Sequence, residues 1–230
     1  KYFLSQKLQK EIFAIICTKK INTIIIGGPK GLGKRNFTLK LAKFILCNLE
    51  NKKEINLDFF EDNKLDFNKL RKTKSFHLFD NNSHPDFFYL NDEEKKLLKT
   101  IPIENVRKLK NFFYKTDSIS RVKIGIIDTI EDLSINSQNL LLKILEELPK
   151  NSYLFIISNN TSNIMETIKS RCAFFYVNSL GKSEFDKFIN DKYTDKLENE
   201  LQFIKNISFG SPGMAKNIVK NDIFVFYKKL

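Results

Sequence analysis

A run of β-branched residues that ends in glycines constrains the fold of this chain more than any other feature. Residues 21–26 read Ile-Asn-Thr-Ile-Ile-Ile and continue directly into Gly27-Gly28. Such a run, stopped by glycines, is typical of a buried strand that enters a turn. Residues 33–47 then place apolar side chains at helical spacing. A strand, a glycine loop and a helix in this order open a doubly wound α/β fold.

The following part of the chain alternates between strand and helix patterns. Helices are predicted at 5–18, after Pro102 and at 136–148, and strands are predicted at 87–90, 122–127, 153–157 and 173–177. Residues 48–83 are rich in Lys, Asn and Asp. We expect a surface insertion or a poorly packed segment there.

The order of these elements predicts the domain organisation. We expect an α/β domain over residues 1–179, with a central, mostly parallel sheet flanked by helices. From about residue 180 strand-like runs largely vanish and helical periodicity takes over, which predicts a small all-helical domain over 180–221. Residues 222–230 look like the start of a further, truncated region.

Composition narrows the class of protein. The chain has no stretch of about 18 apolar residues, so neither a transmembrane helix nor a membrane partner is expected. Residues 1–4 show no sign of a signal peptide. The three cysteines, Cys17, Cys47 and Cys172, lie far apart and never form a CxxC pair. We therefore expect no disulfide framework and no metal site, and a cytoplasmic location.

The formal net charge of the chain is +12. One interpretation is a nucleic-acid partner, because Lys and Arg neutralise phosphates. The other is compositional bias, because the chain is crowded with Lys, Asn, Ile and Phe, which AT-rich codons encode. Charge alone does not distinguish the two.

The glycine loop is close to the phosphate-binding pattern GxxxxGK followed by Ser or Thr, which is known as the P-loop. In this pattern Gly28, Gly31 and Gly33 turn backbone N–H groups inward, and Lys34 reaches phosphate oxygens. Arg35 occupies the position of the hydroxyl that binds Mg²⁺, and a guanidinium cannot bind a cation. We therefore expect the loop to keep its fold around a degenerate, vestigial nucleotide site.

A second motif, Ile124-Gly-Ile-Ile-Asp128, resembles a Walker B strand with Asp128 where a metal ion would be held. In ATPases of this type a Glu normally follows the Asp and polarises the attacking water, but this chain has Thr129. Thr38 and Glu131 are the nearest substitutes, and both are displaced from the required positions. The replaced positions argue against hydrolysis, although ATP and Mg²⁺ remain candidate ligands.

A third motif, Ser170-Arg171-Cys172, lies between a short predicted helix and the last predicted strand. By itself the simplest interpretation of Arg171 is a surface side chain paired with a carboxylate. The motif gains meaning from its place in the order, after the P-loop, the Walker B strand, a Leu-rich helix and a third strand.

Taken together, these motifs resemble the clamp-loader branch of the AAA+ superfamily, and specifically the delta-prime subunits of bacterial DNA polymerase III. The resemblance covers about residues 5–220 and is dense from 84 to 177. The segments that carry it are His84-Pro-Asp86, Ile103 to Leu109, Ile126-Ile-Asp128, Asn136 to Pro149, Thr167 to Cys172 and Gly210-Ser-Pro-Gly213.

The resemblance implies an AAA+ P-loop domain and a helical lid domain in a five-subunit ring that opens a sliding clamp and places it on primed DNA. ATP sites lie between adjacent subunits of such a ring. Arg171, with Ser170 and Cys172 as its motif neighbours, would be an arginine finger for the neighbour's ATP. The implied partners are ATPase and delta-type loader subunits, the clamp and primed DNA, within the polymerase III holoenzyme. Residues 222–230 would begin a collar domain.

The chain also departs from the family pattern. It lacks a four-cysteine zinc module, and no arginine lies near Gly213, where a sensor arginine of the lid is expected. Ser158-Asn159-Asn160 occupies the first sensor segment, and we interpret it as structural.

Three functions are compatible with these residues. The first is a non-hydrolysing clamp-loader subunit without catalytic activity of its own. The second is an active or nucleotide-binding clamp-loader ATPase that uses Lys34 and Asp128. The third is an interaction protein outside replication that reuses the fold, since fold does not determine function.

Overall fold

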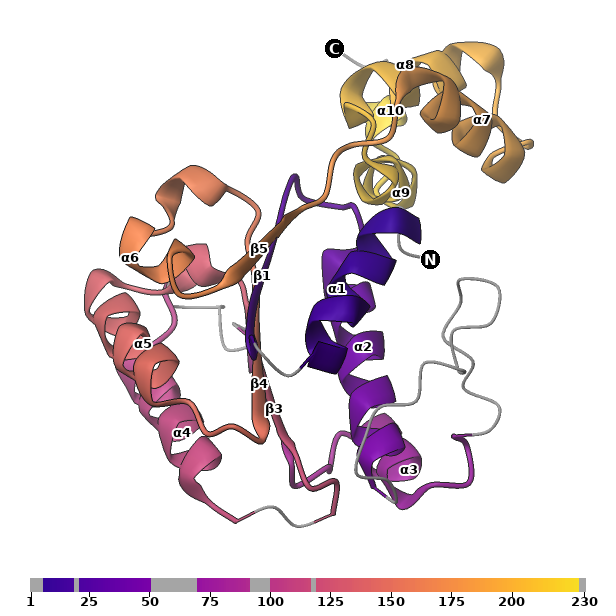
Figure 1. Cartoon of the computed structure of the whole chain (residues 1–230). Helices are drawn as coiled ribbons and strands as arrows, with labels where there is room; N and C mark the ends of the chain where they lie inside the picture. Colours follow the sequence, from indigo (N-terminus) through magenta and orange to yellow (C-terminus); the bar gives the residue numbers. More distant parts are fainter. Residues whose placement is uncertain (1–5, 19–20, 51–69, 92–99, 117–118, 228–230) are drawn as a thin grey trace.

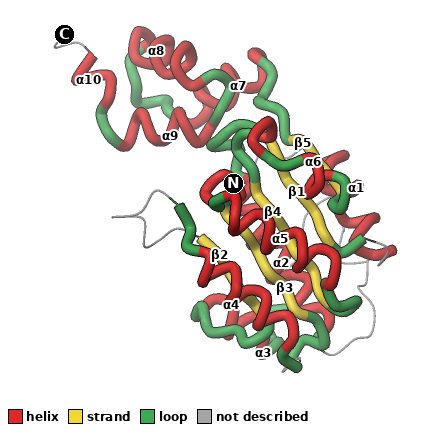
Figure 2. The backbone as a smooth tube through the Cα atoms, turned by 90° about the vertical axis from the view of Figure 1, so that its left-hand side faces the viewer, coloured by secondary structure: helices red, strands yellow, loops and turns green. Residues whose placement is uncertain are grey.

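A parallel sheet forms the centre of the molecule (Figures 1 and 2). The computed structural model describes residues 6–18, 21–50, 70–91, 100–116 and 119–227. In this part of the chain the sheet has five strands in the order β2-β3-β4-β1-β5, and every pairing is parallel. The strands are β1 (Thr23–Gly27), β2 (Phe87–Asn91), β3 (Lys123–Asp128), β4 (Ser152–Ile157) and β5 (Ala173–Tyr176). The α/β prediction is confirmed, and each strand lies within two residues of its expected ends.

Helices cover both faces of the sheet (Figure 1). One face carries α1 (Gln6–Thr18), α2 (Lys34–Leu49) and α3 (Lys74–Asp80). The other face carries α4 (Ile103–Tyr114), α5 (Ile135–Glu147) and α6 (Glu166–Lys169). Short 3-10 turns, η3 (Ile130–Asp132) and η4 (Thr161–Asn163), follow β3 and β4.

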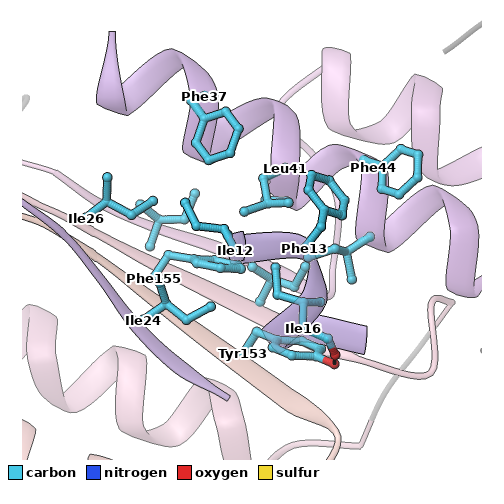
Figure 3. Packing of buried hydrophobic residues seen from close by; sticks show 14 of the residues in the cluster. Ile12, Phe13, Ile16, Ile24, Ile26, Phe37, Leu41, Phe44, Tyr153 and Phe155 are labelled. Carbon is cyan, nitrogen blue, oxygen red and sulfur yellow. Dashed lines mark hydrogen bonds between the residues drawn. The ribbon is translucent and has the colours of Figure 1, made fainter. Parts of the chain in front are cut away.

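Alternation along the strands explains how one sheet supports two hydrophobic cores. Ile24 and Ile26 point to the face of α1 and α2, whereas Ile25 points to the face of α4 and α5. On the first face Phe37 of α2 and Phe155 of β4 join them in a fully buried cluster (Figure 3). Because the inner strands are buried on both faces, they are rich in apolar residues throughout, which is why the sequence identified them.

The segment before β2 corrects one expectation. Residues 48–83 were expected to be an insertion or poorly packed, but Leu70 and Ser75 are buried within them. Glu50 accepts hydrogen bonds from the backbone N–H groups of Lys74 and Ser75, at 3.1 and 2.8 Å, and thereby caps α3. Residues 51–69 lie outside the described residues. At least the C-terminal part of this segment is therefore packed structure.

Helices α7 (Lys182–Lys192), α8 (Glu198–Ser208), α9 (Pro212–Lys220) and α10 (Ile223–Tyr227) follow the sheet and lie beyond one end of it (Figures 1 and 2). Helices α7 to α9 share a hydrophobic core of their own, formed by Phe185, Ile189, Tyr193, Ile204, Ala215 and Ile218. The rings of Phe224 and Tyr227 pack against Phe203 of α8, with centroids 5.2 and 4.7 Å away. Residues predicted to begin a further region thus pack against α8 here.

None of the helices in the described ranges has the length and apolar character needed to cross a membrane.

Candidate functional site

The P-loop connects the carboxyl end of β1 to the first turn of α2, at the edge of a parallel sheet where ligands usually bind. Gly28 and Gly31 have φ angles of 134° and 89°, which side chains rarely allow. A Cβ on Gly28 would lie 2.2 Å from the carbonyl oxygen of Val177, and one on Gly31 would lie 2.4 Å from Oγ of Ser211. Both glycines are therefore required by the backbone and its close neighbours.

Gly33 is the N-cap of α2, with φ of 83°, and Lys34 follows as the first residue of the helix. Nζ of Lys34 donates to the carbonyl oxygens of Gly28 and Pro29, at 2.5 and 2.7 Å, and to Oδ1 of Asn159 at 3.0 Å. An ammonium group has three donors, and all three are directed at protein oxygens. Burial lowers the pKa of Lys34 to about 8. Lys34 therefore holds the loop to the segment after β4.

Arg35 fills the space beside Asp128. Its Nε lies 2.5 Å from Oδ2 of Asp128, and the hydroxyl of Tyr89 donates to the same oxygen at 2.6 Å. Arg35 also bonds the Tyr89 hydroxyl and stacks over its ring, 5.4 Å from the centroid. Burial acts to lower the pKa of Arg35, but the charge of Asp128 and the contacts with Tyr89 raise it. A guanidinium thus neutralises the carboxylate that would bind Mg²⁺, and these residues do not fit the metal.

The two possible substitutes for the missing catalytic groups are engaged elsewhere. Thr38 is fully buried, and its hydroxyl donates to the carbonyl oxygen of Lys34 at 2.9 Å. Oε1 of Glu131 accepts from the Ser158 hydroxyl at 2.5 Å and from the next two backbone N–H groups, both at 2.9 Å. Thr129 donates to Oδ2 of Asp132 at 2.6 Å. Glu131 therefore braces the turn after β4 through Oε1.

A cleft of about 1050 Å³ lies between the P-loop and the C-terminal helices. Its basic lining residues include Lys192 of α7 and Lys216 of α9. At its margin the N–H of Gly213 donates to the carbonyl oxygen of Gly31 at 2.9 Å, and the Ser211 hydroxyl donates to the carbonyl oxygen of Lys30, also at 2.9 Å. A Cβ on Gly213 would lie 2.5 Å from Gly31 O. The start of α9 is thus bonded directly to the loop, and the contact leaves no room for a side chain at Gly213.

Arg171 lies at the opposite end of the strands from the P-loop, just before the amino end of β5. The Thr23 hydroxyl, at the start of β1, donates to its carbonyl oxygen at 2.7 Å. The P-loop begins at the other end of β1, which is about 15 Å away along a five-residue strand. Arg171 therefore does not reach the cleft of its own chain.

The side chain of Arg171 is partly exposed and paired. Nη2 lies 2.8 Å from Oε1 of Glu146, and Nη1 donates to the carbonyl oxygen of Thr167 at 3.0 Å. Ser170 donates its hydroxyl to the same carbonyl oxygen at 3.1 Å. Burial raises the pKa of the neighbouring Cys172 thiol to about 11, so this thiol stays protonated at neutral pH.

A family model described as DNA polymerase III, delta subunit, matches residues 4–181, which is more than half of the chain. The chain belongs to this family. Its curated relatives include the DNA polymerase III subunit delta' of Pseudomonas aeruginosa, 27% identical over 194 residues and 84% of this chain. A delta' subunit of Buchnera aphidicola is 24% identical over 99% of the chain. The chain spans 54% and 64% of the lengths of these two relatives.

Solved structures show the same fold. A DNA polymerase III gamma subunit-related protein of Thermotoga maritima is 18% identical, with a TM-score of 0.51 over 82% of this chain and 51% of that chain. A RuvB variant of Thermotoga maritima is 14% identical, with a TM-score of 0.51 over 98% of this chain and 65% of that chain. At these identities the similarity concerns the fold alone, and the expected AAA+ fold is confirmed.

In this delta-family chain the structure brings some of the predicted site residues together and separates others. Gly28, Gly31, Gly33, Lys34 and Asp128 meet at one edge of the sheet, whereas the motif containing Arg171 lies at the other. Sequence reasoning missed the partners of the two arginines, Tyr89 and Glu146, and the two lysines of the C-terminal helices. Tyr89 could not be identified before the sheet order was known, because only the pairing of β2 with β3 brings it to Asp128.

Proposed function

We propose that this chain is a cytoplasmic, non-hydrolysing clamp-loader subunit of bacterial DNA polymerase III, and that it donates Arg171 to a neighbouring subunit's ATP site. The contact of Arg35 with Asp128 carries the first half of this proposal. Phosphoryl transfer depends on a correctly placed metal ion. Here the guanidinium of Arg35 is bonded to the carboxylate that would bind this metal. The P-loop serves as scaffold, with Lys34 bonded to the protein itself.

The position of Arg171 supports the second half. It is 40% exposed and lies at the edge of the sheet away from its own P-loop, so any phosphate that it meets belongs to another molecule. A guanidinium offers several charge-assisted hydrogen bonds to a γ-phosphate and stabilises the charge that develops during transfer. The proposed partners are the ATPase and delta-type subunits, the sliding clamp and primed DNA, in a hetero-oligomeric ring.

The proposed domain assignment follows from this role. Residues 1–179 form the AAA+ P-loop domain, 180–221 form the lid, and 222–230 begin the collar region. The separate hydrophobic core of α7 to α9 supports the boundary near residue 180.

Nucleotide binding without hydrolysis is the second candidate. The cleft beside the P-loop favours it, because its volume accommodates a nucleotide and Lys192 and Lys216 are among its lining residues. In that case binding would occur without Mg²⁺, since Arg35 already occupies Asp128.

The finger is tested by substitution of Arg171 with Ala in a loader reconstituted from its partner subunits. We expect DNA-dependent ATP turnover to fall several-fold, while the variant keeps its melting temperature. Arg107→Ala is the matched control, because Arg107 is an exposed arginine paired with a carboxylate, Glu104, on α4. Equal turnover in the Arg171 variant and the wild type would exclude the proposed role.

A further inference from the structure

We infer that Glu146 is a positioning residue for Arg171: it holds the guanidinium in the orientation from which it meets the neighbour's phosphate. This inference rests on the proposed role of Arg171 as an arginine finger. The carboxylate of Glu146 belongs to α5 and contacts Arg171, which follows α6. Figure 1 shows α5 and α6 together on one face of the sheet.

Hydrogen bonds with three different elements hold Arg171. Thr23 of β1 holds its carbonyl oxygen, Thr167 of α6 accepts from Nη1, and Glu146 of α5 accepts from Nη2. The first contact places the backbone relative to the sheet, and the second fixes one arm of the guanidinium. Glu146 fixes the other arm of the guanidinium, so we infer that it determines how the planar guanidinium is rotated.

The neighbouring acidic residue has a different orientation. Glu147 faces α4, where Oε2 lies 3.2 Å from Nζ of Lys110 and accepts from the Tyr114 hydroxyl at 2.9 Å. Glu146 instead faces Arg171 of the α6–β5 turn. Two adjacent, exposed carboxylates thus bind different partners, Arg171 and Lys110. A comparison of variants at the two positions therefore distinguishes a general effect of negative charge on α5 from the specific contact with Arg171.

The contact leaves the finger able to bind phosphate. A guanidinium has five N–H donors, and the contacts with Thr167 and Glu146 use one on each Nη, so three remain, including Nε. An unrestrained arginine must lose much of its rotamer freedom when it docks, and a pre-oriented one loses less. Because the two side chains of the ion pair are 40% and 51% exposed, solvent screens its charge, and we expect its main effect to be orientation of the guanidinium.

The inference is tested by steady-state kinetics of the reconstituted loader with Glu146→Ala, Glu146→Gln and Glu147→Ala subunits. We expect Glu146→Ala to lower kcat about two- to fivefold, the range that an exposed ion pair supplies, with the KM for ATP unchanged. Glu146→Gln, which keeps an acceptor oxygen, should recover most of the turnover. Glu147→Ala should match the wild type, and Glu146→Ala should add no further loss to Arg171→Ala.

The outcomes separate the two levels of the account. Loss of turnover in Arg171→Ala with wild-type turnover in Glu146→Ala would overturn the positioning role alone. Higher turnover in Glu146→Ala would also overturn it, since the carboxylate would then compete with the phosphate for Arg171. Wild-type turnover in Arg171→Ala would overturn the finger and the positioning role together. Equal losses of turnover in Glu146→Ala and Glu147→Ala would also overturn the positioning role, since a general effect of surface charge would then explain both.

Discussion

At the scale of single residues, the chemistry of the P-loop depends on the side chain that follows Lys34. Arg35 brings a permanent positive charge to the carboxylate at the end of β3, and Tyr89 holds both groups. A metal ion at Asp128 would have to displace a bonded guanidinium and then tolerate its charge. Arg35 therefore opposes metal binding at Asp128, whereas Lys34 bonds the loop itself.

Replacement of Arg35 by Ser should restore part of the lost site. The substitution frees Asp128 and places a hydroxyl where Mg²⁺ expects one. We predict that binding of a fluorescent ATP analogue becomes Mg²⁺-dependent and tightens at least about tenfold, the effect of a single restored charged contact. Hydrolysis should stay absent, because Thr129 cannot polarise water. Unchanged affinity in fluorescence titration, with and without Mg²⁺, would argue that Arg35 is not what closes the site.

A buried polar cluster near β2 is expected to make stability depend on pH. Nδ1 of His84 accepts from the N–H of Asp86 at 3.1 Å, and its Nε2 lies 3.2 Å from the Ser120 hydroxyl. Asp86 accepts from the backbone N–H of Ser120 and lies 3.8 Å from Nζ of Lys123. Burial lowers the pKa of His84 below its ordinary value. A protonated His84 could no longer accept the hydrogen bond from Asp86.

The sign of the pH effect follows from this lowered pKa. In the unfolded chain His84 binds a proton at the ordinary histidine pKa of about 6.5, and in the folded chain it binds the proton only at lower pH. The contribution of His84 is therefore present above that pH and is lost as pH falls through the folded pKa. We predict a smaller loss of unfolding free energy between neutral and acid pH in His84→Asn than in the wild type. Urea unfolding at several pH values measures this free energy. His77→Gln is the control for the other histidine. If the unfolding free energy of His84→Asn and of the wild type fell equally with pH, the prediction would be contradicted.

Residue types alone revealed part of the site. The mismatches at Arg35 and Thr129 are visible in the sequence, because the motif states which chemistry each position requires. The pairing of Arg35 with Tyr89, 54 positions away, depends on the order of strands and could not be read from either segment. Gly213 was noted only for the arginine that it lacks, whereas the structure shows that a side chain there would meet the backbone of Gly31.

At the scale of elements, the start of α9 links the P-loop directly to the C-terminal helices. Ser211 caps α9 by accepting from the N–H of Met214 at 3.3 Å, and its hydroxyl also donates to Lys30 O. One side chain thus serves both a helix and a loop. The loop conformation and the position of these helices are therefore coupled.

Gly213→Ala should weaken this link. A Cβ there would lie 2.5 and 2.6 Å from backbone atoms of Gly31, which cannot move aside as a side chain could. The better helix propensity of Ala, worth about 1 kcal/mol, should be outweighed by overpacking, and we predict a net loss of about 1–2 kcal/mol. Gly181→Ala is the control, because a Cβ there meets nothing within 4 Å. Denaturant unfolding with equal midpoints for both variants would contradict the tight contact.

Elements were predictable where burial imposes a simple pattern. The inner strands are rich in apolar residues because both faces are covered, and α5 shows a clear apolar face. Helix α3 was not predicted, because seven residues contain too few turns for periodicity and because Glu50, far back in the chain, completes its N-terminus. Its N-terminus combines a local cap, the Thr73 hydroxyl that accepts from the N–H of Phe76 at 3.3 Å, with a tertiary contact that local sequence does not express.

At the scale of the whole molecule, the parallel sheet separates two sites with different tasks. Its carboxyl edge carries a P-loop that is bonded to the chain's own residues. At the other end of the strands, Arg171 contacts Glu146 of α5 and is anchored to β1 through Thr23. Under the proposed function, the sheet would hold Arg171 in a constant place for a neighbour while the chain's own P-loop serves as scaffold.

The most direct test compares two variants in the same reconstituted clamp loader, Lys34→Met and Arg171→Ala, with DNA-dependent ATP turnover as the readout and melting temperatures as the control for folding. The account predicts that Arg171→Ala lowers turnover several-fold, whereas Lys34→Met leaves it at the wild-type level. A loss of turnover in folded Lys34→Met together with wild-type turnover in Arg171→Ala would contradict the account, since this chain would then use its own P-loop and supply no finger.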